Sequence, residues 1–169
     1  MILRRHTQAD IKNIRRLYDL SFPERERIAL HHLLHAPSET FVIEDDDQFL
    51  GFVSMLSVND LCHITYFAIV PEQRGRGYGS KVLKLLEEKK KGSRIIVDVE
   101  MPDPSLMDNA QRRRRIAFYE AAGYVPCDIH YLWSNEEYTI LSWPDSLSKE
   151  DFIAFWKQID PYREIHYHD

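Results

Sequence analysis

The chain has little of several features that mark particular classes of protein. Its 169 residues include two cysteines, Cys62 and Cys127, which lie far apart and show no metal-ligand spacing. This excludes a disulfide framework and predicts free buried thiols in a reducing cytosol. No apolar run approaches the ~20 residues that a membrane helix needs, and residues 1–6 lack the apolar core of a signal peptide. We therefore expect a cytoplasmic protein with no membrane partner.

An excess of positive charge is also missing. The formal net charge is −5, so bulk charge gives no reason to expect a nucleic-acid partner. Internal repeats, low-complexity stretches and long linkers are absent, and the length suits one domain with a sizeable core. We expect a single domain over residues 1–169.

What the sequence does contain is a regular succession of short elements. Thr7 and Asp10 are placed as a helix cap, and Ile11, Ile14 and Leu17 follow at helical spacing. The order β-α-α-β-β-β-α-β-α-β-β-α predicts a mixed α/β or α+β domain. Strands are expected at residues 2–6, 40–44, 49–57, 61–70, 94–100, 124–133 and 138–143, and helices at 11–18, 24–35, 79–91, 109–122 and from 148 onward.

The most informative segment is residues 70–80, Val-Pro-Glu-Gln-Arg-Gly-Arg-Gly-Tyr-Gly-Ser, which has glycine at three alternate positions. It lies between a predicted strand and a predicted helix. Glycine permits positive φ and a close approach to a ligand, and the start of a helix offers unpaired N–H groups to an anion. Arg74 and Arg76 add positive charge. The segment therefore predicts a site for a phosphorylated ligand.

Three kinds of glycine loop compete for this segment. A P-loop needs a Gly-Lys-Ser/Thr ending that the segment lacks. A dinucleotide-binding loop needs a third glycine or alanine where Ser80 stands, and it opens the first βαβ unit of its fold, which this loop does not. The third pattern, Arg/Gln-x-x-Gly-x-Gly/Ala, is met by Arg74, Gly77 and Gly79.

With this pattern the chain resembles the GCN5-related N-acetyltransferase (GNAT) superfamily, as a small member of bacterial type. Ile69-Val70-Pro71-Glu72 matches the family's strand-ending turn, and residues 117–124, Ala-Phe-Tyr-Glu-Ala-Ala-Gly-Tyr, match its second helical motif. The resemblance covers about residues 1–143, and the helix and tail at 148–169 lie outside this core.

The resemblance implies a mostly antiparallel central sheet of about six to seven strands flanked by helices. Its fourth and fifth strands are parallel and splayed, and acetyl-CoA lies in the gap between them. Pantetheine pairs with the main chain of Phe67 and Ile69, a main-chain N–H near Ala68 and Ile69 serves the oxyanion, and the glycine loop holds the pyrophosphate. The implied donor-binding residues are Phe67, Ala68, Ile69, Arg74, Gly75, Arg76, Gly77, Tyr78, Gly79, Ser80 and Arg112.

The implied activity is direct transfer of an acetyl group from acetyl-CoA to a primary amine. Tyr119 matches the family's general acid, which protonates the departing CoA thiolate, although a tyrosine there could simply pack between helix and sheet. Glu100 is the candidate general base, and Asp98, two residues back on the same strand face, could act in its place, in either case directly or through water. The alternatives are a solvated strand end, an arginine partner, or no single base.

Arg112 departs from the family pattern, because many members have asparagine seven residues before the tyrosine. One or two side chains of the run 112–115 are expected to reach the 3′-phosphate of CoA, and the rest to form a solvated face. His31, His32 and His35 lack a third ligand and the glutamate of a zinc motif, so no metal is predicted. They are expected to border the acceptor site instead.

Other features leave the function open. Glu24 or Glu26 either attracts a cationic acceptor or simply begins a helix. A non-catalytic acyl-CoA-binding or regulatory module on the same fold is the main alternative to an enzyme. The aromatic stripe Phe152, Phe155 and Trp156 is typical of core or a homodimer contact, and otherwise of a docking face in an interaction protein. The acceptor could be a polyamine, aminoglycoside, small amine, peptide N-terminus or lysine side chain.

Overall fold

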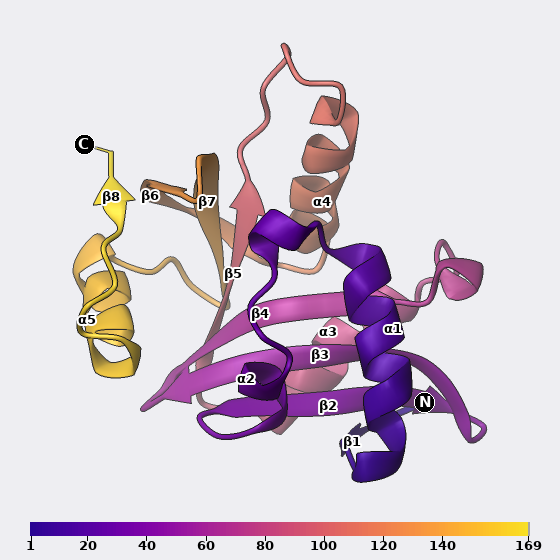
Figure 1. Ribbon diagram of the computed structural model, residues 1–169. Helices are drawn as coiled ribbons and strands as arrows, with labels where there is room; N and C mark the ends of the chain where they lie inside the picture. Colours follow the sequence, from indigo (N-terminus) through magenta and orange to yellow (C-terminus); the bar gives the residue numbers. More distant parts are fainter. Residues whose placement is uncertain (169) are drawn as a thin grey trace. The chain divides into compact units, whose positions relative to one another are not determined.

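The computed structural model describes residues 1–168 and contains, within them, an eight-stranded sheet in the order β1-β2-β3-β4-β5-β7-β6-β8 (Figure 1). Strand β2 pairs antiparallel with both β1 and β3. Strands β4 and β5 run parallel. The predicted fold class, a mixed and mostly antiparallel sheet with parallel fourth and fifth strands, is confirmed. The additional strand is β8 (His166–Tyr167), which lies in a segment predicted to be a tail.

The chain divides into two compact units, which we call the N-terminal unit (Met1–Ser57 with His63–Lys91) and the C-terminal unit (Val58–Cys62 with Gly92–Asp169). Strand β4 (Leu61–Ile69) begins in the C-terminal unit and continues in the N-terminal unit. Beside its start, the Arg94 N–H donates to the Asp60 carbonyl at 2.7 Å. The assignment of one domain to the whole chain stays a prediction.

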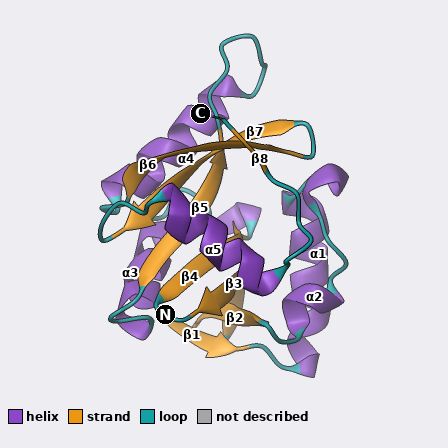
Figure 2. Cartoon of the chain, turned by 90° about the vertical axis from the view of Figure 1, so that its left-hand side faces the viewer, coloured by secondary structure: helices purple, strands orange, loops and turns teal. Residues whose placement is uncertain are grey.

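The N-terminal unit places helices on both faces of its strands, with α1 and α3 on opposite sides (Figures 1 and 2). Apolar side chains of α1, including Ile14 and Leu17, pack against Val42 and Phe52 of the sheet. This burial explains the helical spacing of the apolar residues. The elements are β1 (Ile2–Arg5), α1 (Ile11–Ser21), α2 (His31–Leu34), β2 (Ser38–Asp45), β3 (Gln48–Val58), β4 and α3 (Tyr78–Lys89), with 3₁₀ turns at Gln8–Asp10, Glu24–Glu26 and Pro71–Gln73.

The predicted contact between Thr7 and Asp10 is present, but it caps the 3₁₀ turn Gln8–Asp10 that leads directly into α1. The Asp10 carboxylate accepts hydrogen bonds from the Thr7 N–H at 2.7 Å and the Thr7 hydroxyl at 2.9 Å. Arg4 of β1 donates to both oxygens of the same carboxylate, at 2.8 and 2.9 Å. The cap therefore also ties the helix start to the first strand.

The predicted continuous helix from Glu24 to His35 is wrong. Only the 3₁₀ turn and the four residues of α2 are helical, and the chain between them is extended at Arg27. The Tyr18 hydroxyl accepts from the Ile28 N–H at 2.9 Å and donates to the Ile28 carbonyl at 3.0 Å, and the Tyr66 hydroxyl donates to the Glu26 carbonyl at 2.6 Å. These two tyrosine side chains provide hydrogen-bond partners for backbone groups that a helix would otherwise pair internally.

The C-terminal unit also has helices on both faces of its strands, with α4 on one side of β5 and α5 on the other (Figure 2). The Ser148 side chain caps α5 by accepting from the Asp151 N–H at 3.1 Å. Phe152, Phe155 and Trp156 are buried, so this stripe is core and the docking-face alternative is wrong for these residues. The elements are β5 (Arg94–Glu100), α4 (Asn109–Ala121), β6 (Val125–Trp133), β7 (Glu136–Trp143), α5 (Lys149–Ile159) and β8.

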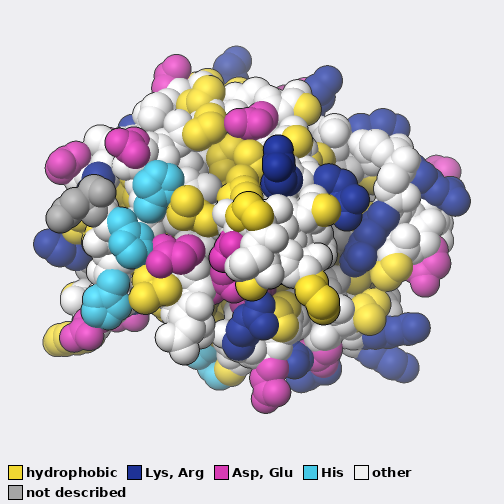
Figure 3. All heavy atoms as spheres, turned by 90° about the horizontal axis from the view of Figure 1, so that it is seen from above, with side chains coloured by type: hydrophobic (Ala, Val, Ile, Leu, Met, Phe, Trp, Pro, Cys, Tyr) yellow, Lys and Arg dark blue, Asp and Glu magenta, His cyan; other side chains and the backbone are white. Residues whose placement is uncertain are grey.

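The surface carries both signs of charge. In the face drawn in Figure 3, acidic side chains lie among lysine and arginine side chains. None of the helices formed by residues 1–168 has the length and apolar character required to cross a membrane.

Candidate functional site

The glycine loop leads from the end of β4 into the first turn of α3. Gly75 and Gly77 have φ of 73° and 77°, a conformation that other residues adopt only with strain. Gly77 is the N-cap of α3, and the first hydrogen bond of the helix runs from the Lys81 N–H to the Gly77 carbonyl at 3.3 Å. The N–H groups of the first turn therefore have no partner inside the helix. A Cβ on Gly75 or Gly77 would meet no protein atom within 4 Å, so the space beside these backbones is open.

The side chain of Arg74 fixes the start of this loop. Its Nε donates to the Ile69 carbonyl at 2.9 Å, and Nη2 donates to the Ser21 hydroxyl at the end of α1 at 3.4 Å. Arg74 therefore joins the end of β4, the loop and α1. Both predicted loop arginines are exposed, but the side chain of Arg74 is held by hydrogen bonds to the protein.

Gly51 of β3 is a site residue that the sequence analysis missed. A Cβ at this position would lie 2.1 Å from the Ala68 carbonyl oxygen, so only glycine fits beside this part of β4. The pairing of β2 with β3 shifts register next to it, between Ile43 and Glu44, and the Val70 N–H donates to the Leu50 carbonyl at 2.9 Å. A glycine inside a predicted strand is the signal that would have found it. Gly51 thus sets the backbone position of Ala68, one of the predicted donor-binding residues.

Tyr119 lies on α4 in the C-terminal unit and is 5% exposed. Its ring packs 5.4 Å from that of Tyr124. Burial raises the pKa of the Tyr119 phenol well above its ordinary value; Arg115 opposes this rise, and the carboxylates of Asp98 and Glu100 add to it. The phenol is therefore protonated at neutral pH and can act as a proton donor.

The two carboxylates of β5 each have a partner within the C-terminal unit. Glu100 is buried and accepts a short hydrogen bond from Arg115 Nη1. Asp98 accepts a short hydrogen bond from the Tyr131 hydroxyl. Burial, followed by the charge of Asp98, raises the pKa of Tyr131 well above its ordinary value. The arginine partner that the sequence analysis left open for one carboxylate is thus present at Glu100.

Arg112 lies inside an ion-pair network of the C-terminal unit. It is 5% exposed, and its Nη1 and Nη2 donate to the two carboxylate oxygens of Glu136 at 2.6 and 3.1 Å. Nε donates to Asp108 at 3.1 Å and Nη1 also to the Met101 carbonyl at 3.1 Å. Four of its five N–H groups are therefore used inside the protein. This geometry favours a structural role over the predicted contact with the 3′-phosphate.

Three histidines of the N-terminal unit, His31, His32 and His35, lie in α2 or directly after it. The rings of His31 and His32 lie 4.0 Å apart, and His35 Nδ1 lies 2.9 Å from the His31 carbonyl oxygen. Within residues 1–168, no three His, Cys, Asp or Glu side chains are grouped so as to hold a metal ion.

The structure thus brings the predicted residues together in two sets. In the N-terminal unit, the end of β4 (Phe67–Ile69) adjoins the loop Arg74–Ser80 through the Arg74 hydrogen bond. In the C-terminal unit, Glu100 and Asp98 lie close enough to Tyr119 for their charges to act on its phenol.

This combination of sheet, glycine loop and buried tyrosine agrees with a known family. The family described as "Acetyltransferase (GNAT) domain" matches residues 36–126, which is more than half of the chain. The chain therefore belongs to the GNAT acetyltransferase family, as its motifs predicted. No curated protein sequence matches it closely enough to serve as a relative.

Solved structures of low identity share the fold. A protein described as a GNAT-family acetyltransferase from Bacteroides thetaiotaomicron is 22% identical with a TM-score of 0.76, over 96% of this chain and 97% of that one. An aminoglycoside 6′-N-acetyltransferase complexed with coenzyme A is 16% identical with a TM-score of 0.66, over 84% and 96%. A spermidine N-acetyltransferase SpeG chimera from Vibrio cholerae and hSSAT is 15% identical with a TM-score of 0.66, over 84% and 95%.

Proposed function

We propose that the chain is an acetyl-CoA-dependent N-acetyltransferase that transfers the acetyl group directly to a primary amine. The observation that carries the proposal is the glycine loop, with positive φ at Gly75 and Gly77 and open space where their side chains would be. Acetyl-CoA supplies the thioester from which the acetyl group is transferred. The unpaired N–H groups at the start of α3 suit its pyrophosphate, because they combine hydrogen-bond donors with the positive end of the helix dipole.

The end of β4 is assigned to the pantetheine arm and the reacting carbonyl. The main-chain N–H groups near Ala68 and Ile69 are the proposed donors to the developing oxyanion, because an oxyanion needs hydrogen-bond donors fixed beside it. Gly51 supports this role by allowing β3 to lie against the Ala68 carbonyl. Arg76, Tyr78, Gly79 and Ser80 complete the proposed loop contacts.

Tyr119 is the proposed general acid for the CoA thiolate, because it matches the tyrosine of the family's second motif and its phenol carries a proton at neutral pH. Glu100 is the proposed general base, acting through water or directly on the acceptor ammonium. Its carboxylate also binds Arg115, so the base role competes with a structural ion pair, and the pH dependence of kcat distinguishes the two. The similarity to an aminoglycoside and a spermidine acetyltransferase supports an amine acceptor. A cytoplasmic location and a homodimer stay predictions.

Calorimetry with acetyl-CoA, followed by a screen of amines for CoA release, tests the proposal. The wild type is expected to bind acetyl-CoA, and Gly77→Ala to weaken that binding at least about tenfold, because a methyl group would strain the backbone and obstruct the anion. Gly92→Ala is the matched control, since Gly92 has a φ of 89° and open space around it but lies outside the loop. Absence of acetyl-CoA binding would overturn the proposal, and binding without CoA release from any amine would favour a non-catalytic acyl-CoA-binding module.

A further inference from the structure

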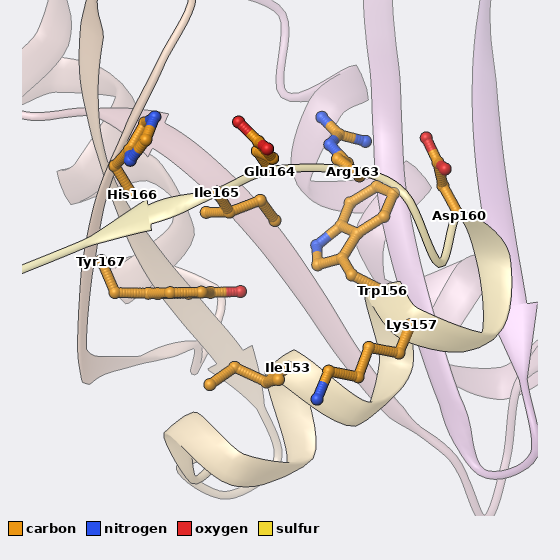
Figure 4. Close-up of a pocket in the computed structure, with 9 residues that line it drawn as sticks. All are labelled: Ile153, Trp156, Lys157, Asp160, Arg163, Glu164, Ile165, His166 and Tyr167. Atoms are coloured by element: carbon orange, nitrogen blue, oxygen red, sulfur yellow. The ribbon is translucent and has the colours of Figure 1, made fainter.

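The segment after α5 places one of the chain's own cations on an aromatic surface. The chain turns at Asp160, whose carbonyl accepts from the Arg163 N–H at 3.2 Å. The guanidinium carbon of Arg163 then lies 4.0 Å from the ring centroid of Trp156 and 4.9 Å from that of Trp133. Figure 4 shows Arg163 lying over the Trp156 ring. Within residues 1–168, no carboxylate forms an ion pair with Arg163. Two indole faces therefore hold this cation without a paired anion.

A carboxylate lies near the same aromatic group. Asp98 accepts from the Tyr131 hydroxyl, and its charge raises the pKa of both Tyr131 and Tyr167, in addition to the larger effect of burial. Arg163 lowers the pKa of the same two phenols. The negative charge of Asp98 and the positive charge of Arg163 thus act on the same two tyrosines in opposite directions. Aromatic faces beside a carboxylate form an arrangement that binds organic cations.

The pocket beside Arg163 gives space for a ligand. Its volume is about 460 Å³, within the range of small-molecule sites. Ile153, Ile165 and the Trp156 ring supply apolar wall, and Asp160 and Glu164 add two carboxylates (Figure 4). The lining also carries Lys157 and Arg163, so the two carboxylates are balanced by two cations while Arg163 is in place. A short alkyl chain can follow the apolar wall, and its positively charged end fits once Arg163 has left the site.

We propose that Arg163 occupies a cation subsite of the acceptor, and that the acceptor is a diamine or polyamine whose second ammonium group displaces Arg163 from Trp133 and Trp156. This inference rests on the proposed acetyl transfer, because it names the class of amine that is acetylated. The segment itself stays anchored when Arg163 moves: β8 pairs Tyr167 with Tyr131, and the His168 N–H donates to the His130 carbonyl at 2.9 Å. Only the Arg163 side chain has to move off the rings of Trp133 and Trp156.

The test compares 1,4-diaminobutane with butylamine, which has the same carbon chain and one charge fewer. A ligand that must displace an internal group binds with an apparent affinity reduced by the fraction of open sites. Arg163→Ala is therefore expected to lower KM for 1,4-diaminobutane about three- to tenfold, the size of a cation–π contact, and to leave kcat and the KM for butylamine within about twofold of wild type. Arg163→Gln, which removes the charge and keeps most of the bulk, serves as a second variant if Arg163→Ala folds poorly.

Lys157→Ala is the matched control, because Lys157 lines the same pocket and is exposed. It removes the same charge, and its effect on the KM for 1,4-diaminobutane is expected to stay within about twofold. The subsite would be overturned if the Arg163 variants changed KM equally for both amines or did not change it at all. It would also be overturned if Lys157→Ala lowered the KM for 1,4-diaminobutane as much as Arg163→Ala does. Acetylation of other amines but not of 1,4-diaminobutane would overturn the substrate class and leave the acetyl transfer standing. Absence of acetyl-CoA binding in calorimetry would instead overturn the proposed function.

Discussion

At the scale of single residues, Tyr119 combines a buried ring with a phenol that several charges influence. Burial raises its pKa more than the nearby Arg115 lowers it, and Asp98 and Glu100 act in the same direction as burial. A phenol in this state is protonated at neutral pH. We propose that it passes its proton to the CoA thiolate as the C–S bond of the thioester breaks.

Tyr119→Phe is expected to lower kcat about 100-fold, because general acid catalysis by one side chain contributes about this much. The affinity for acetyl-CoA should change less than about twofold, since the ring and its packing remain. Steady-state kinetics and calorimetry measure the two quantities. Tyr162→Phe is the control, because Tyr162 is 93% exposed. An unchanged kcat in Tyr119→Phe would remove the acid role and leave only packing.

At the scale of elements, β3 and the end of β4 depend on a glycine. The Ala68 carbonyl occupies the space where a Cβ of residue 51 would be, and the adjacent register shift in β2 and β3 lies at Ile43 and Glu44. Backbone atoms cannot move aside as a flexible side chain can. The position of the proposed oxyanion donors is therefore built into the strand pair.

Gly51→Ala is expected to reduce the free energy of unfolding by about 3 kcal/mol, because the added methyl group overpacks against backbone. Gly92→Ala should cost about 1 kcal/mol, since only its left-handed conformation is strained. Urea unfolding followed by circular dichroism measures both. Equal losses in the two variants would contradict the steric account of Gly51.

The segment between α1 and α2 illustrates a limit of prediction at this scale. The sequence analysis predicts a helix at residues 24–35, but Tyr18 and Tyr66 form hydrogen bonds with the backbone of this segment at Ile28 and Glu26. Tyr66 lies 40 residues away from Glu26 in the sequence. Local periodicity contains no information about such a partner. The prediction of a helix at residues 24–35 was therefore wrong, whereas α1, α3, α4 and α5 were predicted well.

At the scale of the whole molecule, stability against acid depends on buried carboxylates that accept hydrogen bonds. Asp10 is 7% exposed and accepts from Arg4 and Thr7. The hydrogen bond from Arg4 is the largest cause that lowers the pKa of Asp10 well below its ordinary value, and Thr7 adds to it. The ionised form is thus favoured in the folded state. Its contribution is present above the unfolded pKa of about 3.9 and is lost as the pH falls towards the folded pKa.

Asp10→Asn is expected to lower the free energy of unfolding by about 2 kcal/mol at pH 7, the size of a hydrogen bond to a charged group. The difference from wild type should shrink as the pH falls below about 4, because the Asp10 carboxylate of the unfolded wild-type chain then takes up a proton while that of the folded chain stays ionised. Denaturant unfolding at several pH values measures this. Asp145→Asn, at an exposed position, should show no such dependence. A constant difference across the acid range would mean that Asp10 acts by packing alone.

The sequence by itself determined the family, the strand and helix order and the proposed donor loop. The physical reason is that these depend on local features: glycine spacing, a helix start and hydrophobic periodicity. Only the tertiary structure decided what the charged side chains do. Arg112 is bound to Glu136, Arg74 to the Ile69 carbonyl, Glu100 to Arg115, and Arg163 lies on Trp156 and Trp133. A charged side chain can pair with many partners along a chain, and the fold decides which of them lies close enough. Local sequence patterns contain no information about these distances.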